Sequence, residues 1–565
     1  MTAHDFQRLK TSGILKDLSL VAVVIVTLPV LTFLSRGQST QVYSQTAPSN
    51  PSSQVSRAGR LSLLWGDGKP GTNVSDLVAN LTQDRSNSIE ISIPDVLAQQ
   101  HGGILALDRR NLKIQGHLKN IVTRGKSEQV LEAESLEPAE GQSGLPVLGE
   151  VAAAVTGSQP WVNILCKYPD IADMPKNLSY FEGLFSSSKP GLNHYWQEAS
   201  YDQININGSL AFGWYTLPNP RSYYTTLSTS SMLSTIFNDC VAAADADVNF
   251  PNYVGINLMF NGELDGSAWG GSRYATLDGT SRFWYSTWEP PWGYSNQTVL
   301  AHEMGHGFGL PHSSSQYGGS YSNKWDVMSD DWANCSRSTD PTFGCLGQHT
   351  ISYHKDILQW IPSSQKQTVL SGTQTITLER LALPQTSASR MIILPVNGSQ
   401  TLFYTVEVRR WAGYDVKLPL QGVIIHQVNT TTFTPAVVID ADNNGNTGDA
   451  GAAWTVGETF SDVAYGITVT VSSETATGYV VTVTNNPSIL PTPTPTPTLI
   501  PTPTPTPPPI SGDANGDGKI DATDYAIWLS HYNQQTGNGA SDADFDGNGI
   551  VDGVDYAIWL IHYGT

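Results

Sequence analysis

Residues 301–312 read Ala-His-Glu-Met-Gly-His-Gly-Phe-Gly-Leu-Pro-His, and this stretch decides the fold that we expect around it. His302 and His306 are four residues apart, so both project from one face of a helix and can hold a single zinc ion. Gly309 then lets the backbone turn sharply, which brings His312 back as a third imidazole. Three imidazoles leave the fourth position open for water, as in a catalytic zinc site rather than a structural one.

Glu303 supplies the acid–base group that such a site needs. It follows His302 and points towards the open position, where zinc lowers the pKa of a water and Glu303 removes its proton. The pattern His-Glu-x-x-His-x-x-Gly-x-x-His is long, so three core or surface histidines spaced this way by chance are a poor alternative. We therefore expect hydrolysis of peptide bonds by zinc-activated water, although zinc hydrolysis of a non-peptide bond fits the same motif.

A methionine follows the three histidines in the sequence. Met328 lies sixteen residues beyond His312, within Trp325–Asp330. The long zinc motif and this Met resemble the metzincin metalloproteases, in which a tight turn puts a Met beneath the zinc histidines. The resemblance implies that Met328 is a packing floor and not a ligand. Some metzincins carry a Tyr ligand two residues after this Met, but Asp330 stands there, so we assign no Tyr ligand.

Three further stretches resemble the gametolysin-like and immune-inhibitor-A-like secreted peptidases. They are Trp161–Cys166, Gly255–Phe260 and Gly422–Val428, and the resemblance covers roughly residues 60–485. Immune-inhibitor-A relatives usually have Asp as the third ligand, so His312 favours the gametolysin side. Gly255–Phe260 is either an edge strand along which substrate lies or a plain core strand.

In such families the segment before the catalytic domain is a propeptide. The resemblance thus implies that residues 59–155 are an inhibitory prodomain; the alternative is a β-rich accessory domain. Some metzincin propeptides block zinc with a Cys thiolate. No Cys precedes Cys166, so that mode of inhibition is absent and the mechanism stays open.

The N-terminus indicates export. Residues 1–37 contain basic residues followed by an apolar run over 18–34, which is typical of a secretory signal. The run is short for a membrane span, so a cleaved signal peptide competes with an uncleaved anchor. Either reading makes the protein secreted or cell-surface attached, with a membrane contact only if the segment is an anchor. A polar linker over 38–58 follows.

Charge and cysteine use agree with an exported protein. The formal net charge of −20 disfavours nucleic acid as a partner, because phosphates would be repelled. In an exported chain an even number of cysteines favours disulfides over a Cys metal site, for which no CxxC spacing occurs. The short loop between two of them predicts one pair and leaves the other: Cys335 with Cys345 and Cys166 with Cys240.

Beyond the catalytic domain, expected over 156–364, the pattern changes to alternating strands. Residues 365–486 are rich in Val, Thr and Ile at strand spacing and predict an antiparallel β domain. An acidic-amide loop there either binds one calcium ion or is a solvated turn; its residues are Asp440, Asp442, Asn444, Gly445, Asn446 and Asp449. Residues 487–510 are a Thr-Pro repeat, which predicts an extended spacer.

Two loops in residues 511–565 repeat each other and match an EF-hand calcium loop, with oxygens at positions 1, 3, 5, 9 and 12 and a backbone carbonyl at position 7. The expected ligands of the two ions are Asp513, Asn515, Asp517, Lys519, Asp521 and Asp524, and Asp544, Asp546, Asn548, Ile550, Asp552 and Asp555. Each loop runs into a helix, but no helix enters it. Two such units resemble a dockerin, the module that attaches a secreted enzyme to a cohesin-bearing scaffold. The alternative is an isolated calcium-stabilised tail.

Together these observations predict a multidomain α+β chain with a metzincin-type α/β catalytic domain, an antiparallel β domain and a small all-α dockerin. We expect a secreted zinc metalloendopeptidase that acts on protein or peptide substrates and binds a cohesin in a calcium-dependent way. The alternative is a non-catalytic adhesion or scaffold subunit that carries a metzincin fold.

Overall fold

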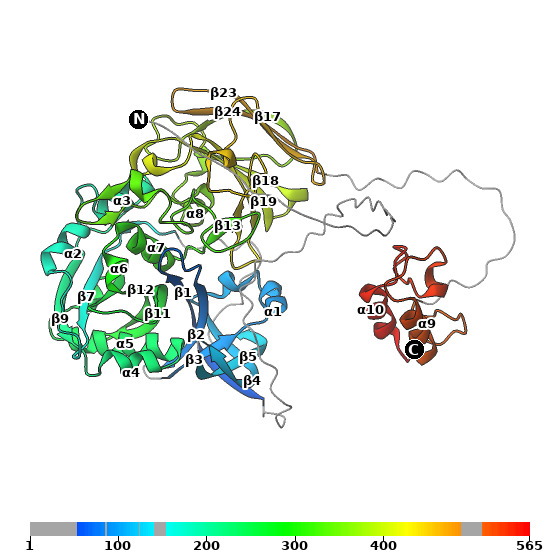
Figure 1. Cartoon of the computed structure of the whole chain (residues 1–565), viewed down its shortest axis with the longest axis horizontal. Helices are drawn as coiled ribbons and strands as arrows, with labels where there is room; N and C mark the ends of the chain where they lie inside the picture. Colours follow the sequence, from blue (N-terminus) through cyan, green and yellow to red (C-terminus); the bar gives the residue numbers. More distant parts are fainter. Residues whose placement is uncertain (1–53, 85–86, 124, 140–153, 488–510, 565) are drawn as a thin grey trace, which may run out of the picture. The chain divides into compact units, whose positions relative to one another are not determined.

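The computed structural model describes residues 54–84, 87–123, 125–139, 154–487 and 511–564 (Figure 1). The expected signal segment, most of the 38–58 linker and the Thr-Pro spacer lie outside these residues. Contacts divide the chain into a large unit, Met1–Ile489, and a C-terminal unit, Leu490–Thr565. Within the described ranges, no helix has the length and apolar character needed to cross a membrane.

The N-terminal strands close into a small barrel. They pair in the order β1-β2-β3-β5-β4 and back to β1, because β1 bonds to β2 on one edge and to β4 on the other. Leucines such as Leu61, Leu81 and Leu131 fill the interior. The strands are β1 (Val55–Gly68), β2 (Ser75–Asp84), β3 (Asn87–Ser92), β4 (Asn111–Thr123) and β5 (Lys126–Pro138), with α1 (Asp95–Gln100) and η1 (Ile104–Leu107) between β3 and β4. We call residues 55–138 the N-terminal barrel. The polar linker expected over 38–58 therefore ends before Val55.

Five further strands extend the same sheet. Their order is β11-β12-β10-β7-β9, in which β12, β10, β7 and β9 are parallel and β11 is antiparallel to β12. The bounds are β7 (Trp161–Lys167), β9 (Leu210–Thr216), β10 (Gly255–Phe260), β11 (Ser267–Leu277) and β12 (Thr280–Glu289), with the two-residue strands β6 (Gly157–Ser158) and β8 (Ile204–Asn205) forming a separate pair. The C-terminal half of β1 pairs antiparallel with β11, so barrel and catalytic region share one ten-stranded sheet.

This order decides between the two alternatives for Gly255–Phe260, in favour of a core strand. Gly255–Phe260 is not an edge strand, because β10 lies between β12 and β7 and every residue in it is buried. A parallel strand with both faces covered is apolar throughout, which explains its unbroken hydrophobic run. The two ends of this five-strand order are β9 and β11, and β1 pairs with β11.

Helices cover both faces of this part of the sheet. One core lies between the sheet and α5, and a second lies around α3 and α7. The helices are α2 (Leu178–Leu184), α3 (Leu192–Ser200), α4 (Arg221–Thr226), α5 (Thr229–Ala244), η2 (Phe250–Asn252), α6 (Pro291–Tyr294), α7 (Gln297–Phe308), η3 (Cys335–Arg337) and α8 (Ser352–Ile357). The predicted disulfides are confirmed: one joins Cys166 in β7 to Cys240 in α5, and the other joins Cys335 to Cys345.

Two sheets form the β-rich region. One has the order β13-β21-β20-β19-β18-β16 and the other β17-β24-β23-β22, and a common apolar core lies between them. The expectation of an antiparallel domain is corrected, because β13 with β21 and β16 with β18 are parallel pairs. The strands are β13 (Ser313–Ser315), β16 (Lys366–Thr368), β17 (Gly372–Glu379), β18 (Met391–Pro395), β19 (Leu402–Arg409), β20 (Gly422–Asn429), β21 (Ala436–Val438), β22 (Thr459–Asp462), β23 (Ile467–Glu474) and β24 (Gly478–Asn485).

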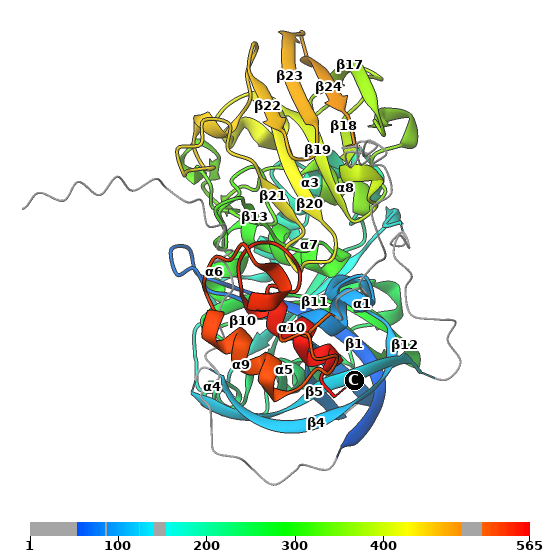
Figure 2. The ribbon, with the colours of Figure 1, turned by 90° about the vertical axis from the view of Figure 1, so that its right-hand side faces the viewer.

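Strand β13 ties the zinc motif to this region, since it begins directly after His312. In Figure 2, α7 lies between the ten-stranded sheet and the sheet that contains β13, β20 and β21. The short remaining elements are η4 (Ser363–Gln365), η5 (Val396–Gly398), η6 (Gly413–Lys417), η7 (Ala450–Ala452) and the hairpin of β14 (Thr339–Asp340) with β15 (Gly344–Cys345). The motif helix is therefore enclosed by structure on both sides.

The C-terminal unit has two similar halves. Its helices are α9 (Ala522–His531), η8 (Gly539–Asp542) and α10 (Gly553–His562). Asp521 and Asp552 cap α9 and α10 in the same way, each with a capping box. The indole of Trp528 donates to the carbonyl of Asp552 (2.8 Å), and that of Trp559 donates to the carbonyl of Asp521 (3.0 Å). Each half thus bonds the loop of the other.

Candidate metal and catalytic site

Helix α7 positions the first two histidines and the glutamate. It begins after Asn296, whose side chain accepts from the amide of Cys345 instead of capping the helix. It ends at Gly309, which has a left-handed φ of 100° that an L side chain rarely adopts. That turn returns the chain towards the helix, and His312 comes to lie beside His302 and His306.

The three histidines meet through one ring nitrogen each. The Nε2 atoms of His302 and His306 are 3.0 Å apart, and each lies 3.1 Å from Nε2 of His312. Three nitrogens bound tetrahedrally to zinc at about 2.05 Å would be separated by roughly 3.3 Å. The side chains are at most 7% exposed. The sequence therefore identified three residues that the fold does bring together.

The hydrogen bonds of Nδ1 in His302 and His306 leave Nε2 of each ring facing the other two histidines. Nδ1 of His302 lies 2.6 Å from the carbonyl oxygen of Val327, and Nδ1 of His306 lies 2.8 Å from that of Leu310. A carbonyl only accepts, so each Nδ1 carries a proton. Burial opposes a charge on His302, but Asp67 raises its pKa to about 9, so without an ion the Nε2 of this ring also carries a proton, which a bound cation would replace. Burial lowers the pKa of His306 to about 3, which keeps it neutral at ordinary pH.

A fourth group joins them that the motif did not predict. Asp67, from the end of β1, places Oδ1 2.9 Å from Nε2 of His312, and Oδ2 3.4 and 3.5 Å from Nε2 of His302 and His306. Burial opposes ionisation of this carboxyl, but His312 and His302 hold its pKa well below the usual range. A single carboxylate more than two hundred residues before the motif has no spacing that could reveal it.

These donors fit a zinc ion. Three Nε2 atoms and a carboxylate converge in a buried place, and Oδ2 of Asp67 has no hydrogen bond of ordinary length among the described residues. Buried acceptors that face one another are unfavourable unless a cation lies between them. Nitrogen and oxygen ligands in this number are those that zinc takes, and His302, His306, His312 and Asp67 would hold it.

Glu303 lies beside this group with both oxygens unengaged. It is fully buried, and no described residue donates to Oε1 or Oε2. Burial, together with the charges of Asp67 and Glu289, raises the pKa of its carboxyl well above the usual range. Gly270 in β11 makes room for it, since a Cβ at that position would lie 2.8 Å from Oε2. The raised pKa favours the protonated carboxyl, which can give up a proton, and a cation held beside it would lower the pKa so that the carboxylate could accept one.

Met328 packs beneath the histidines. It is fully buried, and a Cβ on Gly305 would lie only 2.4 Å from its sulfur. Asp326 organises the turn: its carboxylate accepts from the amide of Met328 (3.1 Å) and from the hydroxyl of Ser313 (2.7 Å), and it pairs with His354 at 3.0 Å. The same turn orients His302 through the carbonyl of Val327.

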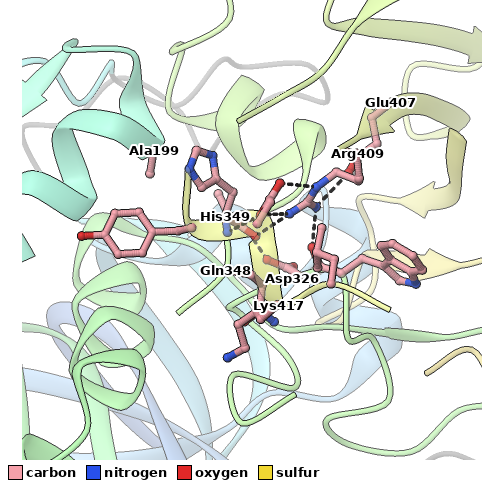
Figure 3. A network of polar contacts seen from close by, with 12 residues as sticks. Ala199, Asp326, Gln348, His349, Glu407, Arg409 and Lys417 are labelled. Atoms are coloured by element: carbon pink, nitrogen blue, oxygen red, sulfur yellow. Dashed lines mark hydrogen bonds and ion pairs between the residues drawn. The ribbon is translucent and has the colours of Figure 1, made fainter. Parts of the chain in front are cut away.

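The β-rich region supports this turn through a buried arginine (Figure 3). Arg409 in β19 donates to the carboxylates of Glu407 (3.1 Å) and Asp415 (2.7 and 2.9 Å). It also donates to the backbone carbonyls of Trp325 and His349. All three charged side chains are fully buried. No local sequence pattern predicts this network, because its partners lie in different elements.

A cavity of about 160 Å³ adjoins the site. The N-terminal barrel contributes one wall, which includes Asp67 and Lys69, and the opposite wall includes Glu303, Trp292 and Asp331. Burial raises the pKa of Asp331 to about 7.

The acidic loop of the β-rich region forms internal bonds. Asn444 donates to both Asp442 (2.9 Å) and Asp449 (3.0 Å), and the amide of Gly445 donates to Asp440 (3.2 Å). Three carboxylates close enough to share an ion do not occur there in the described residues. The third calcium ion remains a prediction.

Residues at the same positions of the two dockerin-like loops make similar hydrogen bonds. Asp513 accepts from the amides of Gly516 and Gly518 (2.7 and 2.8 Å), and Asp544 accepts from that of Gly549 (2.9 Å). The twelfth residues accept from the ninth: Asp524 from the amide of Asp521 and Asp555 from that of Asp552, both at 2.8 Å. In the second loop, carboxylate oxygens of Asp544, Asp546 and Asp555 lie within 4.8 Å of one another.

One family model matches this part of the chain, the dockerin type I domain, over residues 511–563. Residues 511–563 are a type I dockerin domain. Dockerins bind calcium and attach their proteins to cohesins, and proteins that carry them are typically extracellular. The dockerin and both disulfides were correctly predicted from sequence. No curated protein matches the chain.

Proposed function

We propose that the large unit is a zinc-dependent endopeptidase of metzincin type, secreted and attached through its dockerin to a cohesin-bearing scaffold. The observation that carries the proposal is the meeting of three Nε2 atoms at 3.0–3.1 Å beside the unengaged carboxyl of Glu303. Met328 beneath α7 and the antiparallel strand β11 next to the site support the metzincin assignment.

Each residue has a distinct part in this reaction. His302, His306 and His312 hold the ion, and Val327 and Leu310 keep two of the rings in the ligating tautomer. A zinc ion bound there supplies a Lewis acid that polarises the peptide carbonyl and acidifies water. Glu303 accepts a proton from the attacking water and returns it to the leaving amine. Burial of the site excludes bulk water from this transfer.

The decisive experiment separates metal binding from catalysis. Glu303→Gln keeps the shape of the side chain but removes the base, so we expect one zinc per chain and no cleavage of casein or gelatin. Because Asp67 lies against the three histidines, every preparation in this assay also carries Asp67→Ala. The His306→Ala variant should lose both zinc and activity, and phenanthroline should abolish the activity of the protein that carries Asp67→Ala alone. Appreciable cleavage by Glu303→Gln would refute the assigned base, and absence of stoichiometric zinc would refute the enzyme.

A further inference from the structure

We propose that Asp67 is a fourth ligand of the metal and that, through it, the N-terminal barrel holds the peptidase in a latent state. The inference rests on the proposed function and names the regulation of the same site. Its starting point is the position of both carboxylate oxygens within 3.5 Å of the three Nε2 atoms. Three histidines and a carboxylate close a tetrahedral site, whereas catalysis needs one position open.

Contacts from Tyr321 and from the strand β1 itself hold the side chain of Asp67 in place. The hydroxyl of Tyr321 donates to Oδ1 of Asp67 at 2.7 Å, which leaves Oδ2 without a donor and facing His302 and His306. Trp65, two residues earlier on β1, stacks on the ring of His306 with a centroid distance of 5.1 Å. Asp67 is 6% exposed. A carboxylate held from several sides in this way acts as a ligand and not as a surface charge.

The same strand also covers the edge beside the site. β1 pairs with β11 from Leu64 to Gly68, and the pair Asp67 with Ala268 lies within this register. An uncovered β-strand edge presents free amide and carbonyl groups to which an extended peptide can add. β1 therefore places a ligand at the metal site and also covers the neighbouring edge of β11. A bound peptide would take the same two positions.

Other residues of the barrel bond to the elements that form the site. Arg109 donates to the carbonyl of Gly307 in α7 (2.6 Å) and to the hydroxyl of Ser272 in β11 (3.2 Å). Ser75, at the start of β2, lies 3.3 Å from Nδ1 of His312. The barrel has an apolar core of its own, so it can present Asp67 as a preformed element. A propeptide without cysteine could therefore block a zinc site through the carboxylate of Asp67.

The test uses the full chain with Co²⁺ in place of zinc and a small probe, acetohydroxamate. Wild type, Asp67→Ala and Asp67→Asn are compared with Asp95→Ala, which removes an exposed carboxylate from the same barrel. We expect the visible spectrum of Co²⁺ to differ between wild type and the Asp67 variants, because one ligand is exchanged. We expect acetohydroxamate to bind the Asp67 variants at least about tenfold more tightly than wild type or Asp95→Ala, since the position is no longer occupied.

Each result decides the matter. Equal acetohydroxamate affinity and equal spectra in wild type and Asp67→Ala would overturn the role of Asp67 while leaving the metal site intact. Failure of all four proteins to bind one Co²⁺ per chain would contradict the proposed function and this inference together. Thermal melting of each protein shows that it is folded, and Asp67→Asn, which keeps the side-chain shape, covers the case in which Asp67→Ala does not fold.

Discussion

The chain brings the expected ligands of calcium and those of the proposed zinc ion together in different ways. In the dockerin, all expected ligands of one ion lie within twelve consecutive residues, and the loops are held mainly by bonds among themselves. In the large unit, the donors come from β1 and from the α7 segment, and they meet because a ten-stranded sheet and several apolar cores bring them together. We therefore expect the first kind of site to depend on its ion for folding, and the second to form from the packing of the fold without one.

Removal of calcium should therefore have the largest effect, and only on the C-terminal unit. Without the ion, the neighbouring carboxylates of Asp544, Asp546 and Asp555 repel one another, and residues 511–565 should unfold. Trypsin has a single site there, Lys519, so the cut reports unfolding directly. With calcium at about 1,000 times its Kd, EGTA should speed this cut by about 10³-fold.

The measurement is mass spectrometry of the released fragment, in a Glu303→Gln background and with zinc resupplied. Added CaCl₂ should restore resistance, and trypsin sites in the large unit should be cut at an unchanged rate. A cut at Lys519 that is indifferent to EGTA would show that the dockerin, like the large unit, folds without its ions.

In the large unit, we expect the largest loss of stability from changing a buried side chain, that of Arg409, and not from removing an ion. Arg409→Met leaves the carboxylates of Glu407 and Asp415 unpaired in the interior. We expect the free energy of unfolding of the large unit to fall by about 3–5 kcal/mol, as measured by urea unfolding. Arg380→Met is the matched control, because the side chain of Arg380 donates to a backbone carbonyl, that of Leu383, and forms no ion pair within the described residues.

This loss should also depend on pH in a defined direction. Burial opposes ionisation of Asp415, but Arg409 lowers its pKa in the folded chain. A lowered pKa contributes stability above the unfolded value of about 3.9, and the contribution is lost as the pH falls through the folded value. The difference between wild type and Arg409→Met should shrink at acidic pH; a difference that is constant from pH 7 to pH 3 would contradict the assigned pairing.

The same contrast explains what the sequence could and could not predict. The dockerin loops and His302, His306 and His312 follow local spacings, and local spacing survives in any fold that forms the helix and turn. Asp67, Asp326 and Arg409 reach their partners only through sheet order and domain packing, for which no local pattern exists. Gly255–Phe260 shows the same limit: its apolar run predicts a strand but does not distinguish an edge from the centre.

The packing of Met328 provides a third test, with a smaller effect. Gly305→Ala places a Cβ 2.4 Å from the sulfur of Met328, so the turn must shift. We expect a loss of about 1–3 kcal/mol, partly offset by up to about 1 kcal/mol from the better helix propensity of Ala. Met328→Ala should relieve the clash, so the double variant should be less destabilised than the sum of the two single variants. If the losses of stability from the two single variants simply add in the double variant, Met328 does not pack against Gly305 of α7.

The smallest effect should come from the symmetric bonds within the dockerin. Trp528→Phe removes one indole bond to Asp552, and Trp559→Phe removes its counterpart to Asp521. Each variant should lose about 0.5–1.5 kcal/mol in the presence of calcium, since one hydrogen bond is lost and the ring remains. Thermal melting and the rate of the Lys519 cut should give the same loss for both within about 0.5 kcal/mol. If one variant unfolds while the other is unaffected, the two halves are not equivalent, and one loop forms the structure on which the other depends.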